Sequence, residues 1–81
     1  MKREQIEELI KNNREIEFRY LGKRFSITYY NDGRENYISF CEFYKKPTDV
    51  KEASELFELK IGSLTLEEVF QSLPDSAFDI Y

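Results

Sequence analysis

Hydrophobic and polar residues alternate along residues 16–29, on both sides of a single glycine. The apolar positions in this stretch are Ile16, Phe18, Tyr20, Phe25, Ile27 and Tyr29. Such alternation is typical of β-strands that bury one face. A two-residue turn at Leu21-Gly22 pairs Phe18 with Phe25 and Ile16 with Ile27, and it places every apolar side chain on one side of the hairpin.

The type of this first turn is left open by the sequence. A type I′ turn needs positive φ at both central positions, which Gly22 adopts freely and Leu21 does not. A type II turn or a bulged loop is the alternative.

A second turn signal follows at Asn31-Asp32-Gly33, where the Asp-Gly pair favours a tight hairpin. With Asp32-Gly33 at its centre, Ile27 faces Ile38 and Phe25 faces Phe40. The third strand then adds its apolar residues to the face that the first hairpin defines, so the sequence predicts a three-stranded antiparallel meander. The opposite face is predicted to present Glu15, Glu17, Arg19, Arg24, Ser26, Thr28, Tyr30, Tyr37, Ser39 and Cys41.

Helical patterns flank the meander. A first helix is predicted over residues 2–12, where Ile6, Leu9 and Ile10 form a narrow apolar stripe. Pro47 ends the meander because it cannot donate to a strand ladder. A second helix is then expected to begin at Thr48 or Asp49 and to end at Gly62.

The third helix has the sharpest local signal. Thr65-Leu66-Glu67-Glu68 is a capping box, Leu64 is placed to contact Val69, and Pro74 ends the helix. Residues 76–81 alternate and fit a short edge strand or a segment lying over the sheet. Together these elements predict one α+β domain over residues 1–81, in the order α-β-β-β-α-α, with the helices mainly on one face of the sheet.

Composition argues against an enzyme. The chain of 81 residues contains no His, which removes the usual general base and the commonest transition-metal ligand. Cys41 is the only cysteine, so no intrachain disulfide and no cysteine-rich zinc site is expected. Acidic pairs such as Glu67 and Glu68 lie near predicted helix N-termini, where the helix dipole accounts for them. We expect no catalytic residue, no cofactor and no metal site.

Charge is distributed unevenly along the chain. The net charge is −4, with +2 over residues 1–46 and −6 over residues 47–81. An acidic chain disfavours general nucleic-acid binding, which normally shows a basic excess. The start at Met1-Lys2-Arg3-Glu4 lacks the apolar core of a signal peptide, and no apolar run approaches the roughly 20 residues that span a membrane. A cytoplasmic location is the default expectation.

Two stretches resemble a known group of sequences. The hairpin from Ile16 to Lys23 (IEFRYLGK) and the helix start from Lys60 to Val69 (KIGSLTLEEV) are similar to those of a loose group of short uncharacterised proteins from Gram-positive bacteria and their phages or prophages. The resemblance covers most of the chain from Ile16 onward. It implies a phage or prophage relation and supplies no catalytic residues. Where similar proteins have Asn-Gly at the first turn, this chain has Leu21-Gly22.

Basic and aromatic residues near the non-core face form the main candidate surface. They are Arg19, Arg24, Tyr30, Tyr37, Phe43 and Tyr44. Tyrosine is enriched at interfaces, so the leading hypothesis is a non-enzymatic protein-interaction or regulatory module, a monomer or weak homodimer, with an unknown protein partner. The first helix or the C-terminal tail could instead cover this surface.

Two other functions are carried as alternatives. The acidic residues 47–81 fit an inhibitor or nucleic-acid mimic that acts on a basic partner. The Arg and Tyr side chains fit the stacking of single-stranded bases on a sheet. The second alternative is less favoured, because Glu15 and Glu17 share that face.

Overall fold

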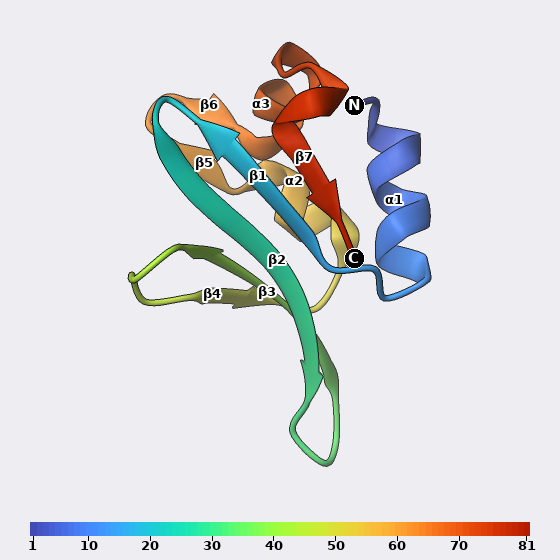
Figure 1. Cartoon of the computed structure of the whole chain (residues 1–81). Coiled ribbons are helices and arrows are strands. Elements are labelled where there is room, and N and C mark those ends of the chain that lie inside the picture. Colours follow the sequence, from blue (N-terminus) through green and yellow to red (C-terminus); the bar gives the residue numbers. More distant parts are fainter.

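A five-stranded antiparallel sheet is the centre of the fold, in a computed structural model that describes residues 1–81. Its strands are β1 (Ile16–Tyr20), β2 (Lys23–Asn31), β3 (Asn36–Glu42), β4 (Thr48–Val50) and β7 (Phe78–Ile80), in the spatial order β4-β3-β2-β1-β7. The other elements are α1 (Arg3–Lys11), α2 (Ala53–Glu58), β5 (Lys60–Ile61), β6 (Leu64–Thr65), α3 (Leu66–Ser72) and the 3₁₀ turn η1 (Asp75–Ala77). Helices α2 and α3 lie behind the sheet in Figure 1. The α+β class is confirmed, and the three predicted strands are present as β1, β2 and β3. The sheet has five strands and not three, because β4 and β7 extend it on its two sides, so the predicted order α-β-β-β-α-α is incomplete.

The first hairpin has the predicted register. Ile16 pairs with Ile27 and Phe18 pairs with Phe25. Its turn has φ of 51° at Leu21 and 74° at Gly22, so both central residues are left-handed, as a type I′ turn requires and a type II turn does not. Leu21 therefore adopts a backbone conformation that disfavours side chains with a Cβ, and its own side chain is 79% exposed.

Replacing Leu21 with asparagine is expected to raise the free energy of unfolding by about 1 kcal/mol, because asparagine tolerates positive φ far better than leucine. Urea denaturation measures the change. The matched control is Leu21→Ala, which also removes the exposed leucine side chain but lacks the side-chain amide that helps asparagine adopt positive φ. Equal midpoints for the two variants would contradict the explanation.

The second hairpin differs from the prediction by two residues. Tyr29 pairs with Ile38 and Ile27 pairs with Phe40, whereas the sequence placed Ile27 opposite Ile38. A shift of two residues keeps each side chain on its face. The predicted core face is therefore correct although the register is wrong.

Hydrogen bonds in the loop explain the shift. The loop holds four residues, Asp32 to Glu35, closed by a 3.2 Å bond from the Asp32 N–H to the Glu35 carbonyl. The Asp32 carboxylate accepts the N–H groups of Arg34 and Glu35 at 2.9 Å, and the Asn31 side chain accepts the N–H of Gly33 at 2.7 Å. These side chains accept hydrogen bonds from the backbone N–H groups of a four-residue loop, and they thereby favour it over the tight Asp-Gly turn.

The second helix begins later than predicted. Residues Thr48–Val50 form strand β4 against β3, with Val50 opposite Ile38, and α2 begins only at Ala53. Thr and Val are β-branched and favour strands, and the partner strand supplies the ladder. The predicted end at Gly62 is also wrong. The helix ends at Glu58, and Gly62, with φ of 63°, lies in the turn between β5 and β6.

The first and third helices agree with the sequence. Helix α1 spans residues 3–11 and buries Ile6 completely. At α3, the Thr65 hydroxyl accepts the N–H of Glu68 at 3.3 Å and the Glu68 carboxylate accepts the N–H of Thr65 at 3.0 Å. The bond from the Thr65 N–H, together with one that the Thr65 hydroxyl donates to the same carboxylate, lowers the pKa of the Glu68 carboxyl. None of the three helices has the length and hydropathy needed to cross a membrane.

Replacing Thr65 with alanine is expected to lower the free energy of unfolding by about 1 kcal/mol, because the N-terminal N–H groups of α3 lose their cap. Urea denaturation again measures the change. Ser63, an exposed turn residue of similar size two positions earlier, provides the control variant Ser63→Ala. A loss no larger than that of the control would mean that the capping box contributes nothing.

Thirteen buried residues, all hydrophobic, form one core between the sheet and the helices. Phe18 is its centre: its ring lies 5.1 to 6.4 Å from the rings of Phe25, Phe70, Phe78 and Phe40. Phe78 belongs to the predicted C-terminal edge strand, and it pairs with Phe18 across β1 and β7. The tail thus extends the sheet at an edge and leaves its second face uncovered.

Candidate functional site

The second face of the sheet is solvated, and its two arginines are paired with acidic side chains. None of its ten predicted residues is buried. Arg19 contacts the Asp79 carboxylate at 2.9 Å and donates to the Ser76 carbonyl at 2.8 Å. Arg24 contacts the Glu17 carboxylate at 3.2 Å. Because each arginine already has an acidic partner on the same face, the surface offers less free positive charge for nucleic acid than the sequence suggests.

The six candidate residues separate into three groups along the sheet. Arg19 lies beside β7. Arg24 lies over the ring of Phe43 at 4.4 Å, and Tyr44, which is fully exposed with φ of 68°, meets Phe43 edge-on at 6.2 Å. Tyr30 and Tyr37 lie at the far end of the β2–β3 hairpin, which extends beyond the other strands in Figure 1. The predicted surface is therefore three local sites.

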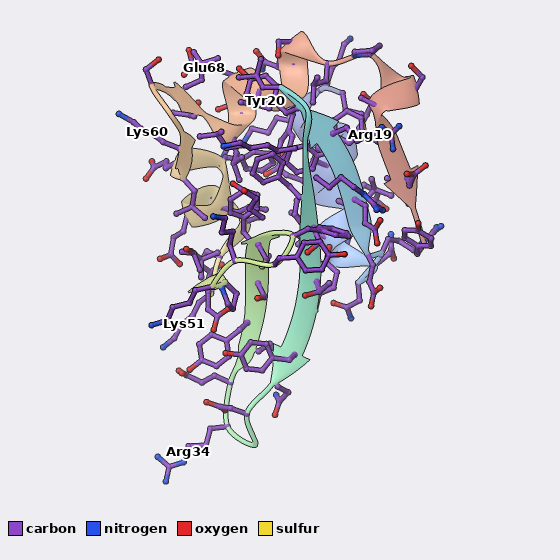
Figure 2. All side chains as sticks on the ribbon, turned by 60° about the vertical axis from the view of Figure 1, so that its left-hand side comes forward. Arg19, Tyr20, Arg34, Lys51, Lys60 and Glu68 are labelled. Atoms are coloured by element: carbon purple, nitrogen blue, oxygen red, sulfur yellow. The ribbon has the colours of Figure 1, made fainter.

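Tyr30 and Tyr37 form an ordered pair at the hairpin end. Their rings stack with centroids 5.1 Å apart and planes 23° apart. The Tyr30 hydroxyl donates to Asp49 of β4 at 2.6 Å, and the Tyr37 hydroxyl donates to Glu35 at 3.1 Å. Glu35 in turn pairs with Lys51 at 2.8 Å. Figure 2 shows Lys51 and the hairpin on the same side of the molecule.

A groove of about 690 Å³, which we call the hairpin groove, lies beside this pair. It is formed by the C-terminal half of α1, the β2–β3 hairpin and the start of α2. Its hydrophobic lining residues are Ile10, Tyr29, Tyr30, Tyr37, Ile38 and Ala53. Three glutamates and two lysines complete the lining together with asparagines. A concave surface that combines apolar and aromatic side chains with polar groups is typical of a binding site.

Sequence reasoning found Tyr30 and Tyr37 but missed the parts of the groove contributed by the helices. Ile10 belongs to the apolar stripe predicted for the first helix, and Ala53 lies within the range predicted for the second helix. Both also line the groove, because helix and hairpin meet only in the folded chain. No signal within either helix identifies such a contact. Tyr29 was assigned to the core face, where it is half-buried.

The tyrosines of this region resist ionisation. Burial, together with the nearby Glu15 carboxylate, raises the pKa of Tyr29 to about 12. A hydrogen bond to Asp49 raises the pKa of Tyr30 to about 12, and one to Glu35 does the same for Tyr37. The fold therefore favours the neutral phenol at all three positions.

Alkaline titration followed by ultraviolet absorbance is expected to show three tyrosines that ionise near pH 12, above the ordinary pKa of 10.0. Because these pKa values are raised in the fold, the stability that the phenols contribute is complete below pH 10 and is lost between pH 10 and 12. Tyr30→Phe and Tyr37→Phe should each remove one phenol from the late step. A single step near pH 10 in the folded protein would contradict the hydrogen bonds described.

Neither a metal site nor a related protein identifies a function. No three Cys, Asp or Glu side chains converge as a metal centre requires. Cys41 is half-buried, and its thiol lies 3.0 Å from the carbonyl oxygens of Glu42 and Lys45. Comparison with protein-family models, curated proteins and solved structures finds no match to this chain.

Proposed function

We propose that this protein is a non-enzymatic binding module that recognises a protein partner through the hairpin groove and the Tyr30–Tyr37 pair. The observation behind the proposal is the position of the pair: a stacked aromatic surface, 45% exposed at Tyr30, directly beside a groove of about 690 Å³. Large, partly exposed tyrosines are enriched at the centres of protein interfaces.

The fixed orientation of the two rings favours binding. Asp49 and Glu35 hold the two hydroxyl groups, and Lys51 holds Glu35. Side chains that are already ordered lose less conformational entropy when a partner arrives, so more of the contact energy appears as affinity. The mixed charge of the rim suits a polypeptide better than a polyanion, because glutamates outnumber lysines around the groove.

A quantitative pull-down from cells that naturally make the protein tests the proposal. The baits are the wild type, the double variant Tyr30→Ala/Tyr37→Ala, and the control Arg19→Ala/Asp79→Ala, which removes an ion pair elsewhere on the same sheet face. We expect at least one protein to be captured equally by wild type and control and about tenfold less by the tyrosine variant. Identical captures by all three baits would refute a role for the hairpin groove.

The solvent-facing acids of the helices support a second candidate, an inhibitor or nucleic-acid mimic that acts on a basic partner. In the acidic residues 47–81, Glu52, Glu55 and Glu58 are exposed and form no ion pair. Attraction of this kind weakens as salt rises, because the Debye length falls to about 3 Å at 1 M. The same pull-down at low and high salt separates the two: a basic protein that is released by salt and unaffected by the tyrosine variant would favour the acidic helices.

A further inference from the structure

We infer that a second pocket binds a phosphorylated small molecule. The pocket has a volume of about 360 Å³ and lies at the other end of β2 and β3 from the hairpin groove. It is an open pocket formed by the start of β2, the end of β3, the β3–β4 loop and the β5–β6 hairpin. We call it the lysine pocket, because its lining includes Lys23, Lys45, Lys46 and Lys60.

Positive charge without an ion-pair partner is concentrated in the lysine pocket. The chain has a net charge of −4 and seven lysines, and four of these lysines line this one pocket. None of the four forms an ion pair, although Arg3, Arg19, Arg24 and Lys51 elsewhere each pair with a carboxylate. Glu42 is the single acidic residue in the lining. Exposed positive charges around one pocket attract an anion.

The chemistry of the lining points to phosphate. A lysine ammonium group binds phosphate oxygens as a point charge with three donors, and its flexible stem adapts to the anion. This flexibility matters for Lys60, whose side chain extends from β5 into solvent in Figure 2 and has to turn inward on binding. A phosphate ester has enough charge to engage several lysines together, whereas a single carboxylate neutralises one.

The size and floor of the pocket favour a small molecule. A volume of about 360 Å³ lies near the lower end of the range of roughly 300–1,000 Å³ for small-molecule sites. Beneath the lysines lie Phe25 and Phe40, whose rings stack 5.7 Å apart with planes 4° apart. A ligand with an apolar or aromatic body can place that body toward these rings and its phosphate at the rim.

The lysine pocket is independent of the proposed protein-binding site. It shares no lining residue with the hairpin groove, and the two lie at opposite ends of the β2–β3 ladder. A phosphorylated ligand is therefore expected to bind the protein equally well when Tyr30 and Tyr37 are replaced. Failure of either proposal leaves the other unaffected.

Isothermal titration at low ionic strength tests the inference, with pyrophosphate and ADP as separate probes. The variants are Lys23→Gln/Lys46→Gln and a control, Lys2→Gln/Arg34→Gln, which removes the same charge from exposed positions outside the pocket. We expect saturable binding to the wild type, weakened at least about tenfold by the pocket variant and less than about threefold by the control. Urea denaturation of each variant confirms that the fold is intact.

The two probes show whether the pocket recognises the phosphate groups alone or also the organic body that carries them. Tighter binding of ADP than of pyrophosphate would support a ligand whose organic body contacts Phe25 and Phe40, and equal binding would support recognition of the phosphate groups alone. Equal weakening by the two double variants would overturn the inference, because general attraction would then account for the binding. Absence of saturable binding to the wild type would overturn it as well.

Discussion

Replacing Phe18 with alanine is expected to lower the free energy of unfolding by about 3–5 kcal/mol, the usual range for a large aromatic side chain deleted from a core. Phe18 is 1% exposed and lies within ring contact of Phe25, Phe40, Phe70 and Phe78. The cavity left by alanine therefore removes contacts to both the sheet and α3. Because a whole small domain is stable by only about 5–15 kcal/mol, this single change removes a large share of the total.

Urea denaturation followed by far-ultraviolet circular dichroism measures the loss. Phe18→Leu keeps most of the apolar volume and should fall between the wild type and Phe18→Ala, which keeps the test informative if the alanine variant does not fold. Tyr44→Ala is the control, since that aromatic ring is fully exposed and its removal should change stability by less than about 0.5 kcal/mol. Similar losses for Phe18→Ala and Tyr44→Ala would refute the central position of Phe18.

Local signals explain which parts of the fold the sequence predicts. The α3 capping box uses residues 65–68 alone, and the alternation in residues 16–29 assigns side chains to faces without knowledge of any partner. Both predictions are confirmed. The sequence leaves the type of the first turn open, because leucine disfavours the positive φ that Leu21 adopts between the paired strands.

Pairing with another strand explains one error, and hydrogen bonds within a loop explain another. Strand β4 is three residues long and exists through its ladder with β3, whereas Thr48 and Asp49 have the local chemistry of a helix cap. The predicted register of the second hairpin differs from the observed one by two residues, because Asn31 and Asp32 stabilise a four-residue loop. Local pattern reasoning weighs turn residues by type and does not evaluate these competing hydrogen bonds.

The residues of the candidate site also divide into those with a local sequence signal and those brought together only by folding. Tyr30 and Tyr37 were identifiable because they alternate with core residues and remain on the open face. The hairpin groove was not predictable, because α1, α2 and the hairpin converge there from three separate parts of the chain. The lysine pocket was missed for a related reason: residues 23, 45, 46 and 60 are dispersed in an acidic sequence and become a cluster only through folding.

Replacing Phe78 with alanine is expected to lower the free energy of unfolding by about 3 kcal/mol, at the lower end for a buried phenylalanine because it lies on an edge strand. Its ring is 7% exposed and lies 5.8 Å from Phe18 and 6.0 Å from Phe70. Only three residue pairs join β7 to β1, and Phe78 is the one buried residue of β7. Its side chain is therefore the main anchor of the C-terminal strand. Urea denaturation measures the global loss.

Hydrogen exchange separates detachment of β7 from weakening of the whole core. The Tyr81 N–H donates to the Glu15 carbonyl at 2.8 Å and should lose protection in Phe78→Ala by a larger factor than amides of the β2–β3 ladder. The control Asp79→Ala breaks the ion pair with Arg19 but leaves the ring in place. Both partners are about half exposed, so a change below about 1 kcal/mol is expected. If Asp79→Ala exposes the Tyr81 amide as much as Phe78→Ala does, the surface ion pair and not the buried ring holds β7 to the sheet.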